Sequence, residues 1–349
     1  MPHPQSPITN HQSKIILIPG DGVGQEVIPA AAEVLAALGL ELAFSEAPAG
    51  FAHFQRTGDA IPDETLADVQ AAGRALFGAT SSPSTVVPGY RSPILAMRKA
   101  FDLYANLRPT FSLPGPFSRP GIDLLVVREN TEGLYAGRER VEDDGATAIA
   151  ERVITRRGSE RIARVAYEQA RQRLAGASRP AAVTIVHKAN VLKLTDGLFR
   201  AECLKVAAQY PEIRTGEMLV DAMAMRLMRD PERFDVLVTT NLFGDILSDE
   251  ASALMGGLGV APSANLGERA AVFEPVHGSA PDIAGQGLAN PIGAILSAAM
   301  LVEHLGQPAA AARVRAAVAE TVRAGTLTPD LGGTANTQAV TRAVIGYLS

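Results

Sequence analysis

The sequence predicts an α/β protein built on a mostly parallel sheet and divided into two domains. Three observations support this class. The 349 residues are 47% hydrophobic, short β-branched runs alternate with longer amphipathic stretches, and two Pro/Gly-rich segments interrupt the alternation. At about 100–200 residues per domain, the length fits two domains with a cleft between them. A net charge of −5 without basic runs argues against a nucleic-acid partner.

Strands are expected where Val, Ile and Leu follow one another, which is typical of strands buried on both faces. The five runs are residues 14–19, 75–79, 123–128, 182–187 and 235–240. Helices are expected between them, where apolar residues recur at helical spacing. The five helical stretches are residues 25–38, 159–174, 197–209, 245–255 and 291–305. Because strands alternate with helices, ligands are expected at the turns that precede the helices.

The Pro/Gly-rich segments 107–121 and 256–267 are the expected crossings between domains, and two crossings predict an inserted domain. The single cysteine, Cys203, lies among apolar residues and is expected to be a core thiol. Residues 1–13 lack an apolar signal segment, and no run of about 18 apolar residues occurs. We therefore expect a soluble cytoplasmic protein without a membrane partner.

The first expected strand ends in a glycine-rich turn, Gly20-Asp21-Gly22-Val23-Gly24, where glycines would let the backbone approach a ligand closely. Its spacing is GxGxG rather than GxGxxG, and no acidic residue about twenty positions later ends a second strand. A Rossmann dinucleotide site is therefore the weaker interpretation of this turn.

Three acids stand near expected strand ends. Asp245 and Asp249 are four residues apart on an expected helix, so that both carboxylates project from one face, and Asp221 follows another apolar run. A solvated helix face is the ordinary explanation, but the adjacent Ile246 and Leu247 favour a partly buried site. Such hard oxygen ligands suit Mg²⁺ or Mn²⁺, and no cysteine cluster supports zinc.

Cationic and proton-carrying side chains accompany these acids. Arg98, Arg108 and Arg128 could together hold a polycarboxylate, although a single arginine is more often in a surface ion pair. Tyr135 and Lys188 could relay protons if a metal and arginines lowered their pKa values, although packing or solvation explains either residue alone.

Residues 272–282 form a Gly/Pro-rich stretch that is expected to be a loop, leading to a helix start near Asn290. Such a loop could wrap an adenosine. Asp282 would accept hydrogen bonds from the ribose hydroxyls and repel a 2′-phosphate, which favours NAD over NADP. His277 is the histidine expected to be functional.

Five segments, GDGVGQEV, RENTEGLY, HKANVLKLTDGLF, TTNLFGDILSD and EPVHGSAPDIAG, occur in this order. The chain resembles the metal-dependent β-decarboxylating dehydrogenases that act on isocitrate, 3-isopropylmalate and homoisocitrate, from about residue 14 to residue 340. The resemblance implies that family's fold, with two α/β domains around a central cleft, which is not a Rossmann fold. It also implies a large cofactor-binding domain of residues 1–108 and 260–349, an inserted substrate and dimerisation domain of residues 109–259, and a homo-oligomer, a dimer or a tetramer.

The resemblance also implies roles for individual residues. Tyr135 would protonate carbon after CO₂ loss, and Lys188 would take the hydroxyl proton; Lys188 and Asp221 would act in the neighbouring subunit's site. The metal ligands would be Asp221, Asp245 and Asp249. The substrate contacts would be Ser92, Arg91, Arg98, Arg108, Arg128 and Asn190. The cofactor NAD would contact Glu274, His277, Gly278, Ser279, Ala280, Asp282 and Asn290.

The segment of residues 89–98 is expected to distinguish the substrates, because it leads up to Arg98 and its other residues lie about one helical turn before that arginine. Isocitrate enzymes commonly have Ser-Leu-Asn here, whereas this chain keeps Ser92 and has Ile94 at the asparagine position. The run Ser-Pro-Ile is similar to that of homoisocitrate dehydrogenases of the α-aminoadipate route to lysine. Some of those enzymes have an arginine at the position of Leu95, for which Arg91 could substitute. Activity on 3-isopropylmalate or isocitrate, mixed specificity and a non-catalytic regulatory subunit remain alternatives.

Overall fold

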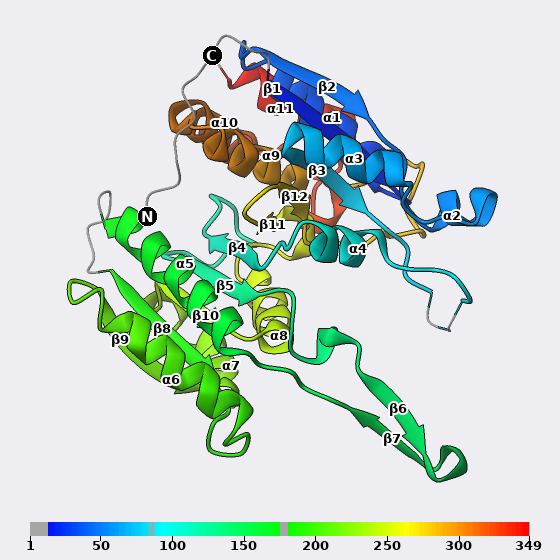
Figure 1. Cartoon of the computed structure of the whole chain (residues 1–349). Helices are drawn as coiled ribbons and strands as arrows, with labels where there is room; N and C mark the ends of the chain where they lie inside the picture. The colour runs from blue at the N-terminus through cyan, green and yellow to red at the C-terminus, as the bar shows by residue number, and fades with distance from the viewer. Residues whose placement is uncertain (1–12, 84, 86, 175–180, 349) are drawn as a thin grey trace.

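Ten strands form one sheet at the centre of the protein. The computed structural model describes residues 13–83, 85, 87–174 and 181–348, and Figure 1 follows the sheet across both halves of the molecule. The strand order is β2-β1-β3-β12-β11-β4-β5-β10-β8-β9. The strands are β1 (Ser13–Gly20), β2 (Leu42–Glu46), β3 (Arg74–Ala79), β4 (Ala105–Phe111), β5 (Asp123–Glu129), β8 (Ala182–His187), β9 (Arg214–Leu219), β10 (Val236–Thr239), β11 (Pro262–Leu266) and β12 (Ala271–Pro275).

The five expected strands are confirmed as β1, β3, β5, β8 and β10, and all their pairings with one another are parallel. The sheet is mostly parallel, as expected, and its antiparallel pairings are confined to the middle, where β11 is antiparallel to both β12 and β4, and β4 is antiparallel to β5. β4 overlaps the start of the expected crossing 107–121, β11 lies inside the expected crossing 256–267, and β12 occupies the start of the expected loop 272–282. The sequence pattern missed them because polar side chains interrupt their apolar runs. The division into domains at residues 108/109 and 259/260 stays a prediction.

The five expected helices are confirmed as α1, α5, α6, α8 and α9, with ends shifted by a few residues. α8 begins four residues earlier than expected, directly after Thr240. The helices are α1 (Gly24–Ala36), α2 (Phe51–Thr57), α3 (Asp63–Ala72), α4 (Pro93–Ala100), α5 (Arg156–Leu174), α6 (Thr195–Ala207), α7 (Val220–Arg229), α8 (Asn241–Ser252), α9 (Ile292–His304), α10 (Pro308–Arg323) and α11 (Thr337–Gly346). Across the described residues, none of these helices has the length and apolar character needed to span a membrane.

The two faces of the sheet have different cores. On one face a continuous apolar cluster joins α1, α5, α6 and α9, and Cys203 is buried within it. Burial raises the pKa of the Cys203 thiol, as expected for a core cysteine. On the other face there are two separate clusters, one under α3 and α4 and one under α7 and α8.

The space between those two clusters is polar. Side chains alternate along a strand, and Ala264 and Phe273 belong to the continuous cluster. Their neighbours Asn265 and Glu274 therefore point to the opposite face, as do Asn106, Arg108 and Arg128. A strip of buried polar side chains thus crosses β12, β11, β4 and β5 at the middle of the sheet.

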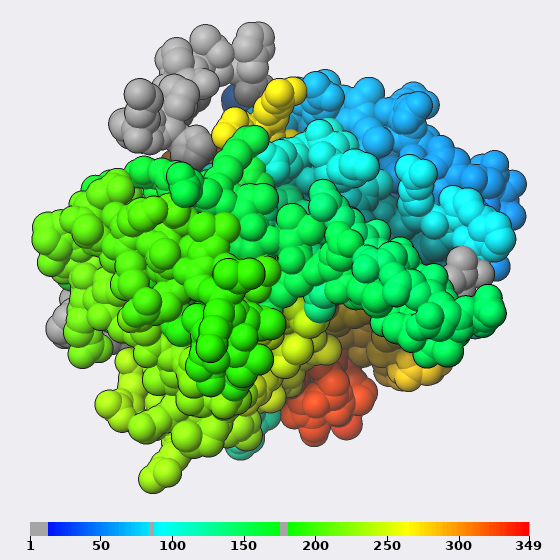
Figure 2. All heavy atoms as spheres, turned by 60° about the horizontal axis from the view of Figure 1, so that its bottom comes forward, coloured from blue at the N-terminus to red at the C-terminus, as the bar shows by residue number. Residues whose placement is uncertain are grey.

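A two-stranded hairpin, β6 (Glu139–Glu142) and β7 (Thr147–Ala150), extends away from the sheet in Figure 1. In Figure 2 it forms a green ridge that runs outward to the right of the half carrying β8 and β9. At its base, Arg152 donates to Thr240 Oγ1 over 2.8 Å and lies 2.7 Å from the buried Asp196 carboxylate. The hairpin is thereby anchored to the residue that precedes α8.

Candidate active site

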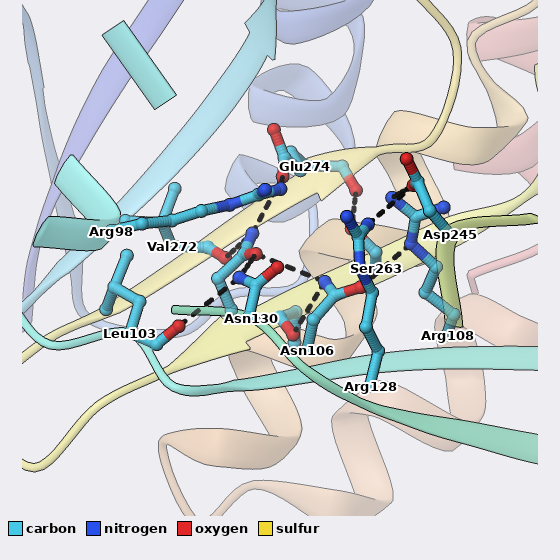
Figure 3. A network of polar contacts seen from close by, with 12 residues as sticks. Arg98, Leu103, Asn106, Arg108, Arg128, Asn130, Asp245, Ser263, Val272 and Glu274 are labelled. Atoms are coloured by element: carbon cyan, nitrogen blue, oxygen red, sulfur yellow. Dashed lines mark hydrogen bonds and ion pairs between the residues drawn. The ribbon is translucent and has the colours of Figure 1, made fainter. Parts of the chain in front are cut away.

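The three expected arginines converge in the polar strip. Arg98 comes from α4, Arg108 from β4 and Arg128 from β5, and each is at most 8% exposed. Figure 3 shows Arg108 and Arg128 directed at Asp245, and Arg98 directed at Glu274. Burial lowers the pKa of Arg98, and burial together with the neighbouring Arg108 and Arg98 lowers the pKa of Arg128 to about 10. A cluster of buried cations is suited to bind a molecule with several carboxylates.

Asp245 and Asp249 face this cluster from α8. Arg128 Nη1 lies 2.6 Å and Arg108 Nη2 3.3 Å from Asp245 Oδ1, and Arg108 Nη1 lies 2.9 Å from Asp249 Oδ1. Burial opposes ionisation of Asp245, but Arg128 and Arg108 hold its pKa below the usual value. Desolvation by the surrounding protein raises the pKa of Asp249, and the charge of Asp245 adds to this effect.

Gly244 lets α8 approach the sheet at this point. A Cβ atom on Gly244 would lie 2.6 Å from Cγ of Arg128, so any larger residue would separate α8 from β5. On the other side of Arg128, Asn241 Oδ1 accepts hydrogen bonds from Nε at 3.1 Å and from Nη2 at 2.8 Å. Asn241 was not expected as a site residue, since its role depends on a strand distant in the sequence.

Tyr135 is joined to the same carboxylate. Its hydroxyl donates to Asp245 Oδ2 over 2.7 Å, and the Arg128 guanidinium carbon lies 5.3 Å from the ring centroid. Partial burial, together with the hydrogen bond to Asp245, raises the pKa of Tyr135, which corrects the expectation that the neighbouring arginines lower it. The phenol is therefore protonated near neutral pH, as a proton donor must be.

Lys188 and Asp221 form a separate pair. Lys188 Nζ lies 2.5 Å from Asp221 Oδ1, and the backbone N–H of Lys188 donates to Asp196 Oδ2 over 2.6 Å. The exposed Asn190 lies in the turn that follows. Within the described residues, no three His, Cys, Asp or Glu side chains are grouped closely enough to hold a metal. One chain thus brings Asp245 and Asp249 together but does not add Asp221 to them.

A pocket opens beside the arginines. Among its lining residues are Ser92, Ile94, Arg98, Arg108, Glu274 and His277. Ser92 directly precedes α4, and Ile94 lies in its first turn. Arg91 is exposed and is not among the residues that line the pocket, and Leu95 is 44% exposed. Ser92, Ile94 and Arg98 are therefore the members of residues 89–98 that line this pocket.

The glycine-rich turn approaches another loop. Val23 N–H donates to Ser279 O over 2.9 Å, and a Cβ on Gly22 would lie 1.9 Å from that oxygen. The hydroxyls of Ser81 and Ser279 are 2.9 Å apart. Gly22 thus permits close contact between two protein segments, and a direct approach of this turn to a ligand stays a prediction.

Of the loop residues expected to contact the cofactor, some line the pocket and others lie at the surface. His277 lines the pocket, its Nε2 is buried with no hydrogen-bond partner in the described part of the chain, and burial lowers its pKa. Gly278 also lines the pocket, and Ala280 has a φ of +38°. Asp282 is exposed. His277 and Gly278 thus lie beside the pocket, and their contact with a cofactor stays a prediction.

Glu274 and Asn290 have structural partners. Glu274 Oε1 lies 3.6 Å from Arg98 Nη2 and accepts a hydrogen bond from Asn265 over 2.8 Å. Asn290 Oδ1 accepts from the N–H of Ile292 over 3.0 Å and its Nδ2 donates to Asp330 over 3.0 Å. Asn290 therefore fixes the start of α9, and its contact with a cofactor stays a prediction.

Asp21 was missed as a site residue. Its carboxylate accepts from the backbone N–H groups of Phe51, Ala52 and Ser81 at 2.7, 2.9 and 2.9 Å. It thereby joins the first turn of α2 to the segment that follows β3. Part of that segment lines the pocket. The only sequence signal was an acidic residue between two glycines, which does not identify partners 30 and 60 residues away.

Comparison with known proteins places these features in a family. The family model described as isocitrate/isopropylmalate dehydrogenase matches residues 14–344. An isocitrate/homoisocitrate dehydrogenase of Thermus thermophilus is 53% identical over 96% of this chain and 98% of its own. A 3-isopropylmalate dehydrogenase of Methanothermobacter thermautotrophicus is 48% identical over 96% of this chain and 98% of its own. The crystal structure of isocitrate dehydrogenase from Methylococcus capsulatus matches with a TM-score of 0.91 and 44% identity, covering 96% of this chain and 99% of that one.

Proposed function

This chain belongs to the isocitrate/isopropylmalate dehydrogenase family and is a decarboxylating dehydrogenase, and we propose that its reaction is the NAD-dependent oxidative decarboxylation of homoisocitrate to 2-oxoadipate. This reaction would serve lysine synthesis by the α-aminoadipate route. The observation that carries the proposal is the pocket in which Ser92 lies with Arg98 and Arg108. The two guanidinium groups suit the malate-like carboxylates, and the Ser92 hydroxyl is a hydrogen-bond donor for a distal carboxylate.

Asp245 and Asp249 would hold Mg²⁺ or Mn²⁺. Their carboxylates are hard oxygen donors on successive turns of α8, and both lie beside Arg108 at the edge of the polar strip. We propose that Asp221 and Lys188 complete the neighbouring subunit's site, in a homodimer or homotetramer. When bound, the metal would polarise the substrate hydroxyl and carbonyl, and NAD would accept the hydride.

The chain's own groups would bind the substrate and move two protons. Arg98, Arg108 and Arg128 would hold the carboxylates so that the β-carboxylate can leave as CO₂. Lys188 would accept the proton of the substrate hydroxyl while hydride goes to NAD. Tyr135 would donate its Oη proton to the carbon that loses CO₂, a role supported by the position of its hydroxyl 2.7 Å from Asp245 Oδ2.

NAD is proposed to lie against residues 277–282. The unpartnered, buried Nε2 of His277 is suited to a polar atom of the adenosine, and Gly278 leaves room beside it. The exposed Asp282 would accept hydrogen bonds from ribose hydroxyls and repel a 2′-phosphate. On this basis we expect Asp282→Ser to lower the ratio of kcat/KM with NAD to kcat/KM with NADP.

A second activity, on 3-isopropylmalate, is favoured by Ile94, whose side chain also lines the pocket. Activity on isocitrate, a mixed specificity and a non-catalytic regulatory subunit are further candidate functions. The retention of Tyr135, Lys188 and all three aspartates argues against the regulatory subunit.

The deciding experiment measures kcat/KM for homoisocitrate, 3-isopropylmalate and isocitrate with NAD or NADP and Mg²⁺, following the reduced cofactor at about 340 nm. We expect homoisocitrate with NAD to give the highest value. A preference for 3-isopropylmalate would identify Ile94 as the specificity residue instead. Preference for NADP would contradict the role of Asp282, and the lack of turnover with all three acids would support a regulatory subunit. Gel filtration would test the proposed oligomer.

A further inference from the structure

A buried amide, Asn265, lies at the centre of the polar strip. It faces Asn106 of β4 and Val272 of β12 in the sheet register, and it is fully buried. Its Nδ2 donates to Glu274 Oε1 over 2.8 Å and to Val272 O over 3.2 Å. Its Oδ1 accepts from Nδ2 of Asn106 over 3.1 Å and from Nδ2 of Asn130 over 2.9 Å. Both donors and both lone pairs of this amide are therefore used.

The bonds of Asn265 lead to two of the substrate-binding arginines. Through Glu274 they reach Arg98, whose Nη2 is 3.6 Å from the carboxylate. Through Asn106 they reach Arg108, whose Nε donates to Asn106 Oδ1 over 2.8 Å. Figure 3 shows Arg98 and Arg108 on opposite sides of this network, with Asn106 and Asn130 between them. Arg98 belongs to α4 and Arg108 to β4, so these bonds link two separate elements.

The orientation of the Asn265 amide is fixed by its partners. If the amide rotated by half a turn, its NH₂ group would face the NH₂ groups of Asn106 and Asn130, and its oxygen would face the Glu274 carboxylate. That carboxylate is the neighbouring counter-charge of Arg98, and both side chains are almost completely buried. A buried cation whose counter-ion moves away must move or be exposed to water.

We propose that Asn265 is a positioning residue that sets the placement of Arg98 relative to Arg108 and thereby the affinity for the acid substrate. The proposal rests on the proposed function only in that both arginines bind the carboxylates of one substrate. Asn265 acts through Glu274 and Asn106 and needs no contact of its own with the substrate.

The test compares Asn265→Ala with the parent in steady-state kinetics and in calorimetric titrations with homoisocitrate and 3-isopropylmalate, without cofactor and with Mg²⁺ present. We expect the KM and the Kd for the acid to rise about ten- to a hundredfold, as for the loss of hydrogen bonds to charged groups. We expect the KM for NAD to rise less than the KM for the acid, because Asn265 makes no hydrogen bond to residues 277–282, against which NAD is proposed to lie, and Glu274 is the one expected cofactor contact bonded to this amide. The matched control is Thr321→Ala, which removes the buried hydrogen bond from Thr321 Oγ1 to Ala317 O within α10 and should leave all three constants unchanged.

A second variant, Asn265→Asp, keeps the side-chain volume and tests the same link if the alanine variant does not fold. The introduced carboxylate would lie against Glu274, and two adjacent carboxylates cannot both ionise freely. Only the protonated form of the introduced carboxyl group could donate to Glu274. The Kd for the acid, relative to the parent at each pH, should therefore improve as the pH falls, which a purely structural role would not produce.

The proposal is overturned if either folded variant binds the acid near neutral pH within about twofold of the parent, or if the KM for NAD rises as much as that for the acid. A parent that binds the acids without turnover would refute the proposed function while the variants still test Asn265. A parent that binds neither acid would refute both.

Discussion

The contact between Gly22 and the loop at Ser279 leads to a sharp prediction for Gly22→Ala. Gly22 has a φ of +56°, and an added Cβ would lie 1.9 Å from Ser279 O. An alanine in this left-handed conformation costs about 1–2 kcal/mol. The Ser279 carbonyl must also retreat by about 1 Å to reach an allowed contact, which breaks its bond with Val23 N–H at a cost of about 0.5–1.5 kcal/mol. We therefore expect the free energy of unfolding to fall by about 1.5–3.5 kcal/mol.

The function affected should be cofactor binding. Moving Ser279 displaces its neighbours His277 and Gly278, whereas the arginines belong to other elements. We expect the KM for NAD to rise at least about tenfold and the KM for the acid to stay within about twofold.

The control for Gly22→Ala is Gly39→Ala. Gly39 has a φ of +71°, and no described atom lies within 4 Å of the position that a Cβ would occupy there. It carries the same backbone strain without the collision, so it should lose about 1–2 kcal/mol with no change in either KM. Urea unfolding and steady-state kinetics on both variants measure this difference. If Gly22→Ala lost no more stability than Gly39→Ala and bound NAD normally, the reasoning would be refuted.

Three further variants or reactions test the site and the core. Tyr135→Phe removes the proposed proton donor and should lower kcat by about a hundredfold or more while the KM for the acid changes less than about threefold; a loss of less than about threefold in kcat would contradict the role. Burial lowers the pKa of His277, so the folded chain binds fewer protons there than the unfolded chain, and stability falls as the pH falls through the ordinary histidine range. The free energy of unfolding of His277→Gln should therefore fall less than that of the parent when the pH is lowered from about 7.5 to about 5.5. If both proteins lost the same free energy, His277 would not contribute to the pH dependence of stability. The buried thiol of Cys203, whose pKa is raised, should react with a chromogenic disulfide reagent only after unfolding.

The apolar strands were predictable because a strand that is buried on both faces is apolar at nearly every position. Leu124 and Val126 face one cluster while Leu125 and Val127 face the other, so β5 is apolar along most of its length. β4 and β11 were not predictable in the same way, because one face of each carries polar side chains into the site. Their asparagines, arginine and prolines are typical of a loop when only neighbouring residues are considered.

The charged residues of the site were predictable as types, but their partners were not. The spacing of Asp245 and Asp249 on one helix placed both carboxylates together. The pairing of Asp245 with Tyr135, and of Glu274 with Arg98, depends on contacts over more than a hundred residues. Asn265 had no local signal, since a single amide in a short strand acquires its role only from β12 and β4 on either side of it and from Asn130 after β5.

The position of β11 and β12 in the sheet has a consequence for synthesis on the ribosome. They lie between β3 and β4, yet they follow β4 by about 150 residues, so translation at about 5–20 residues per second delivers them roughly 8–30 s later. During that interval β3 and β4 each lack the neighbour that completes their backbone hydrogen bonds. The nascent chain therefore has open strand edges until its last quarter emerges, and the strip that holds the site is the last part of the sheet to close.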